Sequence, residues 1–454
     1  MLLSSLGTSI ASAALPTLAG SFSAPFQHVQ WIVLAYLLAI TTVVVSVGRL
    51  GDLTGRRRLL VAGLVLFTLA SALCGVAPTL WFLVAARAVQ GAGAAIMIGL
   101  PLALTGGIVS RERTGGAIGL LGTMSAVGTA VGPSLGGLLV ASLGWQAIFL
   151  LNLPLGVLAT LLAHRHLPAD QRSTDSMRTR FDYGGALLLA GIVAAYALAT
   201  TIGRGHVGPV NAGLALAAVI GLGVFVFVES RAASPLLRLS MLRDPLLSAG
   251  LVTSALVSTV IMATLVVGPF YLSRALGLET AVVGLVLSIG PVVAALSGIA
   301  AGRLVDGYGE QSMTLAGLTG AAVGTIMLAL PPVTHGMSGY IAPIVFVTAG
   351  YALFQTANNT RILGAVNPDE RGTVSGMLSL SRNLGLITGA SVMGAVFALA
   401  SRTSEISTAQ PETVAAATRI TFTVAAILIL MAVGVAVAAG QSPRAMKQAD
   451  ECPS

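Results

Sequence analysis

Long apolar runs, separated by short polar segments, repeat along the whole chain. A helix needs about 20 mostly apolar residues to cross roughly 30 Å of hydrocarbon, and each run is about this long. Because lipid offers no partner for free backbone groups, each run predicts a transmembrane helix. The pattern gives about fourteen spans, at residues 2–20, 31–49, 59–77, 80–105, 115–142, 146–163, 181–203, 210–228, 246–272, 281–302, 313–331, 340–362, 372–400 and 416–439.

The Lys and Arg residues are distributed unevenly between the two sides of this arrangement. With both termini in the cytoplasm, 18 of them fall on the inner side and 4 on the outer side. An excess of positive charge in cytoplasmic loops sets the orientation of membrane proteins. We therefore expect both termini in the cytoplasm. The same bias supports the number of spans, because one missed helix would reverse it in every later loop.

The polar segments divide the spans into three groups. Six spans form a first unit, residues 1–163, and six more form a third unit, 246–454, which ends in a short cytoplasmic tail. The central segment, 164–245, carries two further spans between basic loops. The expected fold is an all-α integral membrane protein, with two six-helix bundles and a two-helix insert.

A short motif occurs at equivalent places in the two bundles. The sequence GRLGD begins at Gly48 after the second span, and GRLVD begins at Gly302 after the tenth. Such repetition is typical of secondary transporters. Glycines allow tight turns and a carboxylate can accept from helix N-termini or arginines, so the motif predicts a gate. Its candidate residues are Gly48, Asp52, Gly55, Arg56, Arg57, Gly302 and Asp306. A topology anchor at an anionic surface is the alternative, which explains the arginines but not Asp52 or the glycines.

The fifth span carries glycines at helical spacing. Gly128, Gly132 and Gly136 lie four residues apart, hence on one helix face, and Pro133 removes a backbone donor beside them. A face of small residues lets another helix pack at backbone contact. Together with Gly137, these residues predict a tight seal between the bundles. Generic small-residue packing is the alternative.

Two arginines fall inside predicted spans, Arg87 in the fourth and Arg382 in the thirteenth. A charge near the bilayer centre costs at least about 2.5 kcal/mol, so each is expected to face an aqueous cavity. Polar side chains accompany both arginines and recur in the twelfth span. The candidate cavity residues are Arg87, Gln90, Gln355, Asn358, Asn359, Arg382 and Asn383. Hydrogen bonding between helices, which Asn and Gln often supply, is the alternative.

These motifs together resemble those of the major facilitator superfamily over essentially the whole chain. The resemblance rests on the GRLGD loop, on an Arg-x-x-Gln-Gly element from Arg87 to Gly91, and on the glycine motif of the family's antiporters. With fourteen spans, the chain resembles the drug/proton antiporter branch. This implies two bundles that rock about a midplane cavity, with the loop motif stabilising one face of the cycle and the glycine motif preventing leak.

One position departs from that branch, whose members commonly carry an acidic residue in the first span. Gly7 stands at that place, and no Asp or Glu lies in the middle of any predicted span. Since such a carboxylate would serve as counter-ion for cationic drugs and as proton carrier, its loss favours a neutral or anionic substrate. The remaining candidates for a proton site are Asp182, at the start of the seventh span, and Glu229, at the end of the eighth.

Composition excludes several classes of function. Of the 454 residues, 55% are hydrophobic and 9% charged, against about 25% charged in soluble domains. The net charge of +8 comes from loop clusters without interleaved aromatic residues, so no nucleic-acid partner is expected. Cys74 and Cys452 lack metal-ligand spacing, and the five histidines fall between or at the ends of apolar runs. We therefore expect no metal, no cofactor and no enzyme activity.

The sequence thus predicts a secondary active transporter, an exporter of drugs or small metabolites that is coupled to protons. Its partners would be a small-molecule substrate, the lipid bilayer and protons, and the expected form is a monomer. An importer or facilitative uniporter on the same fold is the alternative. A non-transporting membrane sensor or scaffold is the alternative of a different class. Twenty-three arginines against one lysine suggest GC-rich coding, in keeping with a bacterial inner (plasma) membrane.

Overall fold

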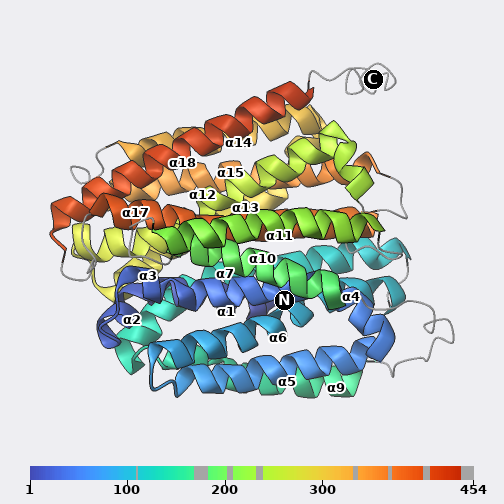
Figure 1. Cartoon of the computed structure of the whole chain (residues 1–454), viewed down its shortest axis with the longest axis horizontal. Coiled ribbons are helices and arrows are strands. Elements are labelled where there is room, and N and C mark those ends of the chain that lie inside the picture. The colour runs from blue at the N-terminus through green and yellow to red at the C-terminus, as the bar shows by residue number, and fades with distance from the viewer. Residues whose placement is uncertain are drawn as a thin grey trace.

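In the part of the chain that the structure describes, every regular element is a helix. The computed structural model describes residues 1–108, 111–167, 183–201, 208–231, 239–330, 336–366, 371–401 and 409–440. Most long helices run side by side along the length of the molecule (Figure 1). The prediction of an all-helical fold is confirmed for these residues.

The first half of the chain folds into a bundle of helices. Its helices are α1 (Leu2–Ala13), α2 (Leu15–Ser21), α3 (Phe26–Val29), α4 (Trp31–Thr54), α5 (Arg56–Gly75), α6 (Leu80–Ile108), α7 (Arg111–Leu143), α8 (Ala147–Leu150) and α9 (Asn152–His166). The first predicted span is bent by 60° between α1 and α2. Pro16 stands in the first turn of α2. Proline lacks a backbone N–H, and it is tolerated at this position because the first N–H groups of a helix have no partner within that helix.

The insert and the second half continue the same pattern. They comprise α10 (Tyr183–Thr201), α11 (Pro209–Arg231), η2 (Leu239–Arg243), α12 (Pro245–Phe270), η3 (Tyr271–Ala275), α13 (Thr280–Tyr308), α14 (Glu310–Ala329), α15 (Ser338–Gly364), α16 (Arg371–Thr388), η6 (Gly389–Met393), α17 (Gly394–Ser401) and α18 (Pro411–Gly440). Two segments, η3 and η6, are single π-helical turns, a form that often occurs at functional places in helices.

Equivalent turns follow the two copies of the repeated motif. Helix α4 ends at Gly55, with φ +98°, and α13 ends at Gly309, with φ +83°. Only glycine adopts these backbone angles without strain, so both turns depend on it. The next helix begins directly after each glycine, as α5 and α14. The internal repetition read from the sequence therefore appears as a repeated helix–glycine–helix corner.

Each predicted span coincides with one helix or with two or three consecutive helical elements. Among the residues that the structure describes, eleven helical segments are long and apolar enough to cross a membrane, or twelve if the bent pair α1 and α2 is one span. Two shorter apolar stretches, Val127–Leu143 and Leu187–Thr200, lie in α7 and α10. By length and composition the structure thus supports eleven or twelve spans, and the count of fourteen stays a prediction.

The helices pack closely within each half and touch across a seam between the halves. In the first half α6 packs on α4 and α5, and α1 packs on α7. In the second half α15 packs on α13 and α14, and α12 packs on α16 and α18. Across the seam α7 packs on α13, and α10 touches both α4 and α16. The insert therefore lies over one side of the seam, between the two halves in Figure 1.

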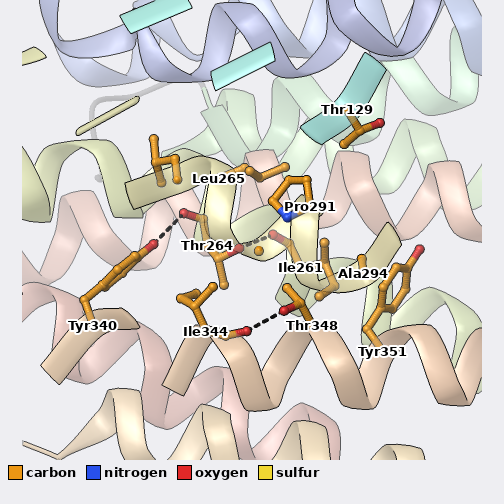
Figure 2. Close-up of a pocket in the computed structure, with 12 residues that line it drawn as sticks. Thr129, Ile261, Thr264, Leu265, Pro291, Ala294, Tyr340, Ile344, Thr348 and Tyr351 are labelled. Atoms are coloured by element: carbon orange, nitrogen blue, oxygen red, sulfur yellow. Dashed lines mark hydrogen bonds between the residues drawn. The ribbon is translucent and has the colours of Figure 1, made fainter. Parts of the chain in front are cut away.

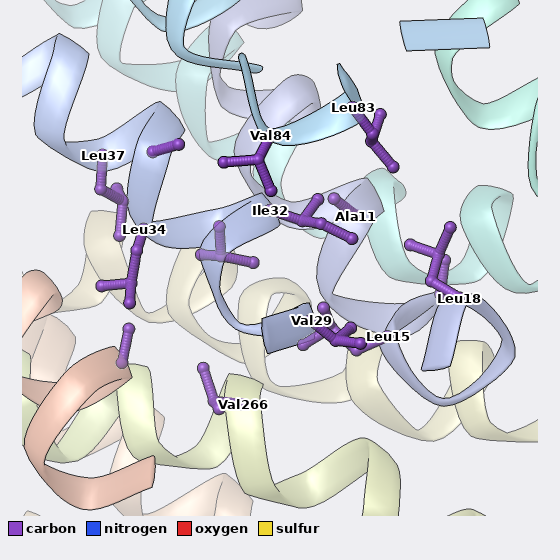
Figure 3. Close-up of a cluster of buried hydrophobic side chains, with 14 of the residues drawn as sticks. Ala11, Leu15, Leu18, Val29, Ile32, Leu34, Leu37, Leu83, Val84 and Val266 are labelled. Carbon is purple, nitrogen blue, oxygen red and sulfur yellow. The ribbon is translucent and has the colours of Figure 1, made fainter. Parts of the chain in front are cut away.

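A continuous apolar core joins the two halves. Ile32 and Leu34 of α4 and Val84 of α6 belong to it, and so does Val266 of α12 (Figure 3). Outward-facing positions are also apolar, including Leu161 at 62% exposed and Leu296 at 72%. An apolar exterior of this kind needs lipid around it, because large exposed apolar surfaces are unstable in water.

Candidate functional site

A cavity of about 100 Å³ lies where α7, α12, α13 and α15 meet (Figure 2). Thr129 of α7 faces it from the first half, and all the other described residues that line it come from the second half. Apolar side chains such as Leu265 and Leu287 form much of its wall. Cavities of roughly 150 Å³ with apolar walls take up benzene, so this space is of the right order for a single apolar ring.

Two tyrosines of α15 stand at opposite ends of the cavity in Figure 2. Tyr340 and Tyr351 are eleven residues apart, which is about 16 Å along a helix. The Tyr340 hydroxyl donates to the carbonyl of Thr264 at 3.4 Å, and the ring of Tyr271 stacks on Tyr340 with centroids 5.8 Å apart. One end of the cavity is therefore closed by a pair of stacked aromatic rings.

The threonine hydroxyls of the cavity are already used as donors. Thr264 donates to the carbonyl of Ile261 at 2.7 Å, and Thr348 donates to the carbonyl of Ile344 at 2.6 Å. Each oxygen keeps a lone pair with which it can accept from a ligand. No charged side chain is among the described residues that line this space. The wall itself therefore suits a flat, mainly apolar solute.

The Tyr351 end connects the cavity to two residues predicted from the sequence. Tyr351 interacts through its hydroxyl with Arg382 of α16 and with Gln355, one turn further along α15. Both residues are half-buried, and the Nε of Arg382 has no hydrogen-bond partner in the described part of the chain. Arg382 and Gln355 thus lie directly behind the cavity wall.

Three asparagines belong to the same set of predicted cavity residues, and one of them bonds one helix to another. Asn358 is 4% exposed and donates to the carbonyl of Gly250 in α12 at 3.2 Å. Asn383 is buried next to Arg382 in the chain, and Asn359 is half-buried. The bond from Asn358 corresponds to the alternative interpretation, hydrogen bonding between helices.

Arg87 lies in a different environment, enclosed by the first half. It is fully buried, and its Nε donates to the carbonyl of Ile32 in α4 at 3.0 Å. Its Nη1 donates to the carbonyl of Gly7 in α1 at 3.1 Å. The guanidinium also lies over the ring of Tyr36, 4.0 Å from the centroid, as cation–π contacts require. Arg87 therefore ties α6 to α1 and α4.

Gln90 completes this network. Its Oε1 accepts from Arg87 at 2.6 Å, and its Nε2 donates to the hydroxyl of Ser71 in α5 at 2.7 Å. The shared helix face predicted for Arg87 and Gln90 is thus present, and it points into the first half. In this conformation neither residue lines the cavity, and their role in transport stays a prediction.

The glycine face of the fifth span packs on α1, within the first half. A side chain at Gly128 would meet the carbonyl of Leu2, and one at Gly136 would come within 2.9 Å of Ile10. Gly132 faces the hydroxyl of Ser9 in the same way. These three residues therefore do not form a contact between the halves.

The contact between the halves is made by the neighbouring face of α7. A Cβ at Gly137 would lie 2.7 Å from the carbonyl of Thr280 and 3.0 Å from the Cα of Gly284 in α13. The carbonyl of Pro133 in turn faces Gly284, and the backbone N–H of Ser134 donates to the hydroxyl of Ser288 at 2.7 Å. Pro133 and Gly137 of this motif thus lie in close contact with the other half, and the role of the motif as a seal stays a prediction.

The residues of the loop motif are not all brought together. Gly48 and Asp52 lie in the last turns of α4, and the surroundings of these two residues lie outside what the structure describes. Arg57 of α5 donates to the carbonyl of His164 in α9, which holds this corner against the end of the first half. Arg56 is half-buried beside it.

The second copy of the motif is open. Asp306 is exposed, and a side chain at Gly302 would meet nothing within 4 Å. Gly302 and Asp306 therefore have space around them in this conformation, and their gating role stays a prediction.

Neither proton-site candidate is among the described residues that line the cavity. Asp182 lies outside the described residues. Glu229 is 2% exposed near the end of α11, a helix that contributes no lining residue to the cavity. Among the described residues, no three His, Cys, Asp or Glu side chains gather as they would around a metal ion.

An aromatic cluster closes the seam at one end of the molecule. Phe26 of α3 lies 4.8 Å from Phe270 at the end of α12 and 5.4 Å from Phe397 of α17, measured between ring centroids. All three rings are at most 2% exposed. Because Phe26 belongs to the first half and the other two to the second, the cluster joins the halves where α3 and α17 meet.

The cavity residues themselves were not predicted from the sequence. Thr129 and Tyr340 are ordinary members of apolar helices, and nothing in their local pattern marks them as cavity residues. One signal was present, since Tyr351 lies four residues before Gln355 and hence on the same face of α15. Extending the polar stripe by one turn would have reached the cavity.

The sequence profile of the Major Facilitator Superfamily matches residues 1–390 of the chain. Among curated proteins, the riboflavin transporter RibZ of Clostridioides difficile is 28% identical over 396 residues, covering 87% of this chain and 86% of that protein. The multidrug resistance protein Stp of Mycobacterium tuberculosis is 32% identical over 394 residues, covering 86% of this chain and 72% of that protein. These relatives and the fold indicate a transporter rather than an enzyme.

Solved structures show the same fold. A bacterial homologue of the human lysosomal transporter Spinster, in an inward-facing and occupied conformation, has a TM-score of 0.72 at 15% identity, covering 100% of this chain and 96% of that one. The xylose transporter XylE of E. coli, in a partially occluded inward-open conformation, has a TM-score of 0.61 at 14% identity, covering 95% and 94%. At these identities the likeness concerns the fold alone.

Proposed function

The chain belongs to the major facilitator superfamily, and from this we propose that it is a proton-coupled exporter that works by alternating access. The observation that supports this most is the position of the cavity, between Thr129 of the first half and three helices of the second. A solute bound there touches both halves. Their relative movement can therefore open the cavity first to one side and then to the other.

The contacts that would have to break during this cycle lie at the seam. Phe26, Phe270 and Phe397 close one end, and the backbone contact of Gly137 with α13 lies along the same seam. We assign the closed end to the outer side, because the sequence predicts both termini in the cytoplasm. In the same view, the repeated loop motif with Asp52 and Asp306 lies on the cytoplasmic side and closes when the outer end opens.

We further propose fourteen spans, with units 1–163 and 246–454 rocking about the cavity and 164–245 as the insert. The two spans beyond the twelve supported by length and composition would be α7 and α10, whose apolar stretches are short. Such a protein would belong to the drug/proton antiporter branch and reside as a monomer in a bacterial inner membrane. An importer or a facilitative uniporter is the second candidate on the same fold.

Energetics allow coupling to a single proton. Expelling a neutral solute against a hundredfold gradient needs about 2.7 kcal/mol. One proton that enters through 100 mV supplies about 2.3 kcal/mol, and one unit of pH adds about 1.4 kcal/mol. With Gly7 in the first span, Glu229 and Asp182 remain the candidates for the carrier. The substrate is neutral or anionic, as the uncharged cavity wall also favours.

Transport assays in proteoliposomes test this function. Riboflavin is a suitable neutral solute because a relative is named for it, and ethidium is a permanently charged cation. We expect riboflavin-like or anionic solutes to move against their gradient only when a proton gradient is imposed, and ethidium to move little. Flux without a proton gradient would indicate a uniporter, and robust ethidium export would contradict the assignment of substrate charge.

A variant that fills the cavity links such flux to this site. Ala294 lines the cavity on α13, whereas Ala300, on the same helix, faces outward. Ala294→Phe should reduce transport at least tenfold, while the matched Ala300→Phe should leave it within twofold of the wild type. Equal activity of the two variants would remove the cavity from the transport path.

A further inference from the structure

We propose that Arg382, together with Tyr351, makes one end of the cavity a site for an anionic group, so that the preferred solute is an aromatic or other flat apolar body carrying a carboxylate, sulfonate or phosphate. This deepens the proposed function and rests on it, since the cavity is taken as the solute site. It also distinguishes the two arginines of the spans, which the sequence alone treats alike.

The first step is the location of positive charge. The described lining of the cavity is uncharged, so the field inside it is set by charges just behind the wall. Arg382 is in contact with the lining residue Tyr351 and forms no ion pair with a described carboxylate. Charges act strongly over short distances where water is excluded. The Tyr351 end is therefore the positive end of the cavity.

The second step is the number of donors that remain available. A guanidinium carries five N–H donors in a planar fork that matches the oxygens of carboxylate and phosphate. The buried Nε of Arg382 has no partner in the described residues. A buried donor without a partner is unfavourable, so an acceptor brought by a ligand would be stabilised there.

Arg87 cannot take this role in the same conformation. Its Nε and Nη1 are engaged by Ile32, Gly7 and Gln90, and its plane is covered by the ring of Tyr36. Its Nη2 has no partner among the described residues, but it is enclosed together with the rest of the side chain and does not border the cavity. The guanidinium is fully enclosed by the first half. Of the two arginines inside the spans, only Arg382 borders the cavity.

The third step is the orientation of the solute. Tyr340 and Tyr351 mark opposite ends of the space, with Leu265, Pro291 and Ile344 between them (Figure 2). An apolar ring between these side chains would direct its polar substituent either to Tyr340, which is stacked and bonded, or to Tyr351. An anionic substituent would be stabilised at the Tyr351 end, because the positive charge of Arg382 lies there without a described carboxylate beside it.

A cysteine reporter in the cavity tests this without knowledge of the natural substrate. Thr129→Cys places a thiol in the wall from the opposite half, in a background in which Cys74 and Cys452 are replaced by Ser. The rates of modification by sulfonatoethyl methanethiosulfonate, an anion, and by trimethylammonioethyl methanethiosulfonate, a cation, are then compared. Arg382→Gln is introduced into this reporter, with Arg419→Gln on the exposed face of α18 as the matched loss of charge.

We expect the ratio of anion to cation rates to fall on the order of tenfold in Arg382→Gln and to stay within twofold of the reporter in Arg419→Gln. Benzenesulfonate should protect the cysteine from N-ethylmaleimide better than benzylammonium, and Arg382→Gln should abolish the difference. An unchanged rate ratio, an unreactive cysteine or equal protection by the two benzene derivatives would overturn the proposal. None of these readouts requires flux, so their failure is distinguishable from a failure of the transport assay.

Discussion

At the scale of single residues, two arginines with similar sequence surroundings occupy unlike places. Arg87 is fully buried and bonded to two backbone carbonyls and to Gln90, whereas Arg382 is half-buried behind the cavity wall. The sequence could show that both lie inside spans and must be compensated. It could not show how, because the compensating groups of Arg87 are carbonyls of Gly7 and Ile32, which are far away in the chain and carry no signal in their side chains.

The environment of Arg87 predicts a role in stability. Arg87→Ala would leave the Gln90 amide oxygen and two carbonyls without their donor and would open a cavity in the first half, at a cost of about 3 kcal/mol. We expect the midpoint of thermal unfolding in detergent to fall by several degrees. Arg419→Ala, on the exposed face of α18, is the matched control and should leave the midpoint unchanged. Equal midpoints for the two variants would show that the network around Arg87 is not stabilising.

At the scale of helices, the positions of the elements could be predicted because the apolar runs are long and lipid enforces helical structure. Which helix meets which could not. The glycines of the fifth span illustrate this, since Gly128, Gly132 and Gly136 face α1 while Gly137 faces α13. A step of one residue turns a helical side chain by about 100°, and the sequence alone does not say which partner stands there.

The close contact between α7 and α13 predicts that Gly284 of α13 does not tolerate a larger residue. A Cβ at Gly284 would collide with the carbonyl of Pro133, whereas one at Gly298, further along α13, would meet nothing within 4 Å. Gly284→Ala should therefore push the helices apart and raise the passive leak of a small solute from proteoliposomes several-fold. Gly298→Ala should stay tight and gain up to about 1 kcal/mol of helix stability. If the two variants leak equally little, the helices do not seal the seam at this contact.

The contact of α10 with the second half predicts a small loss of stability when its hydrogen bond is removed. The hydroxyl of Tyr196 donates to the hydroxyl of Thr388, at 3.0 Å, directly before the π-helical turn η6. Tyr196→Phe removes this bond and should lower the free energy of unfolding by about 1 kcal/mol. Tyr308→Phe, at a residue that is 69% exposed, is the control and should have no effect. The check is thermal unfolding of both variants in the same detergent, and a loss at Tyr308 alone would contradict the role of α10.

At the scale of the whole molecule, the family and the helical fold could be predicted from motif order, and both are confirmed. The cavity could not be predicted, because its walls are tyrosines, threonines and apolar residues from four helices that the sequence separates. The predicted polar stripe of α15 and α16 came within one helical turn of it, at Gln355 and Arg382. Polar residues thus indicate the region of a binding site, and packing decides which side chains form its wall.

The central claim is that the two halves separate at the end closed by Phe26, Phe270 and Phe397 in every transport cycle. The most direct measurement is solute flux in proteoliposomes with cysteines at Phe26 and Phe397, joined by a short, reducible bifunctional methanethiosulfonate in a background without native cysteines. We predict that cross-linking stops flux and that reduction restores it, while each single cysteine variant treated alike stays active. Full flux through the cross-linked protein would contradict alternating access at this seam.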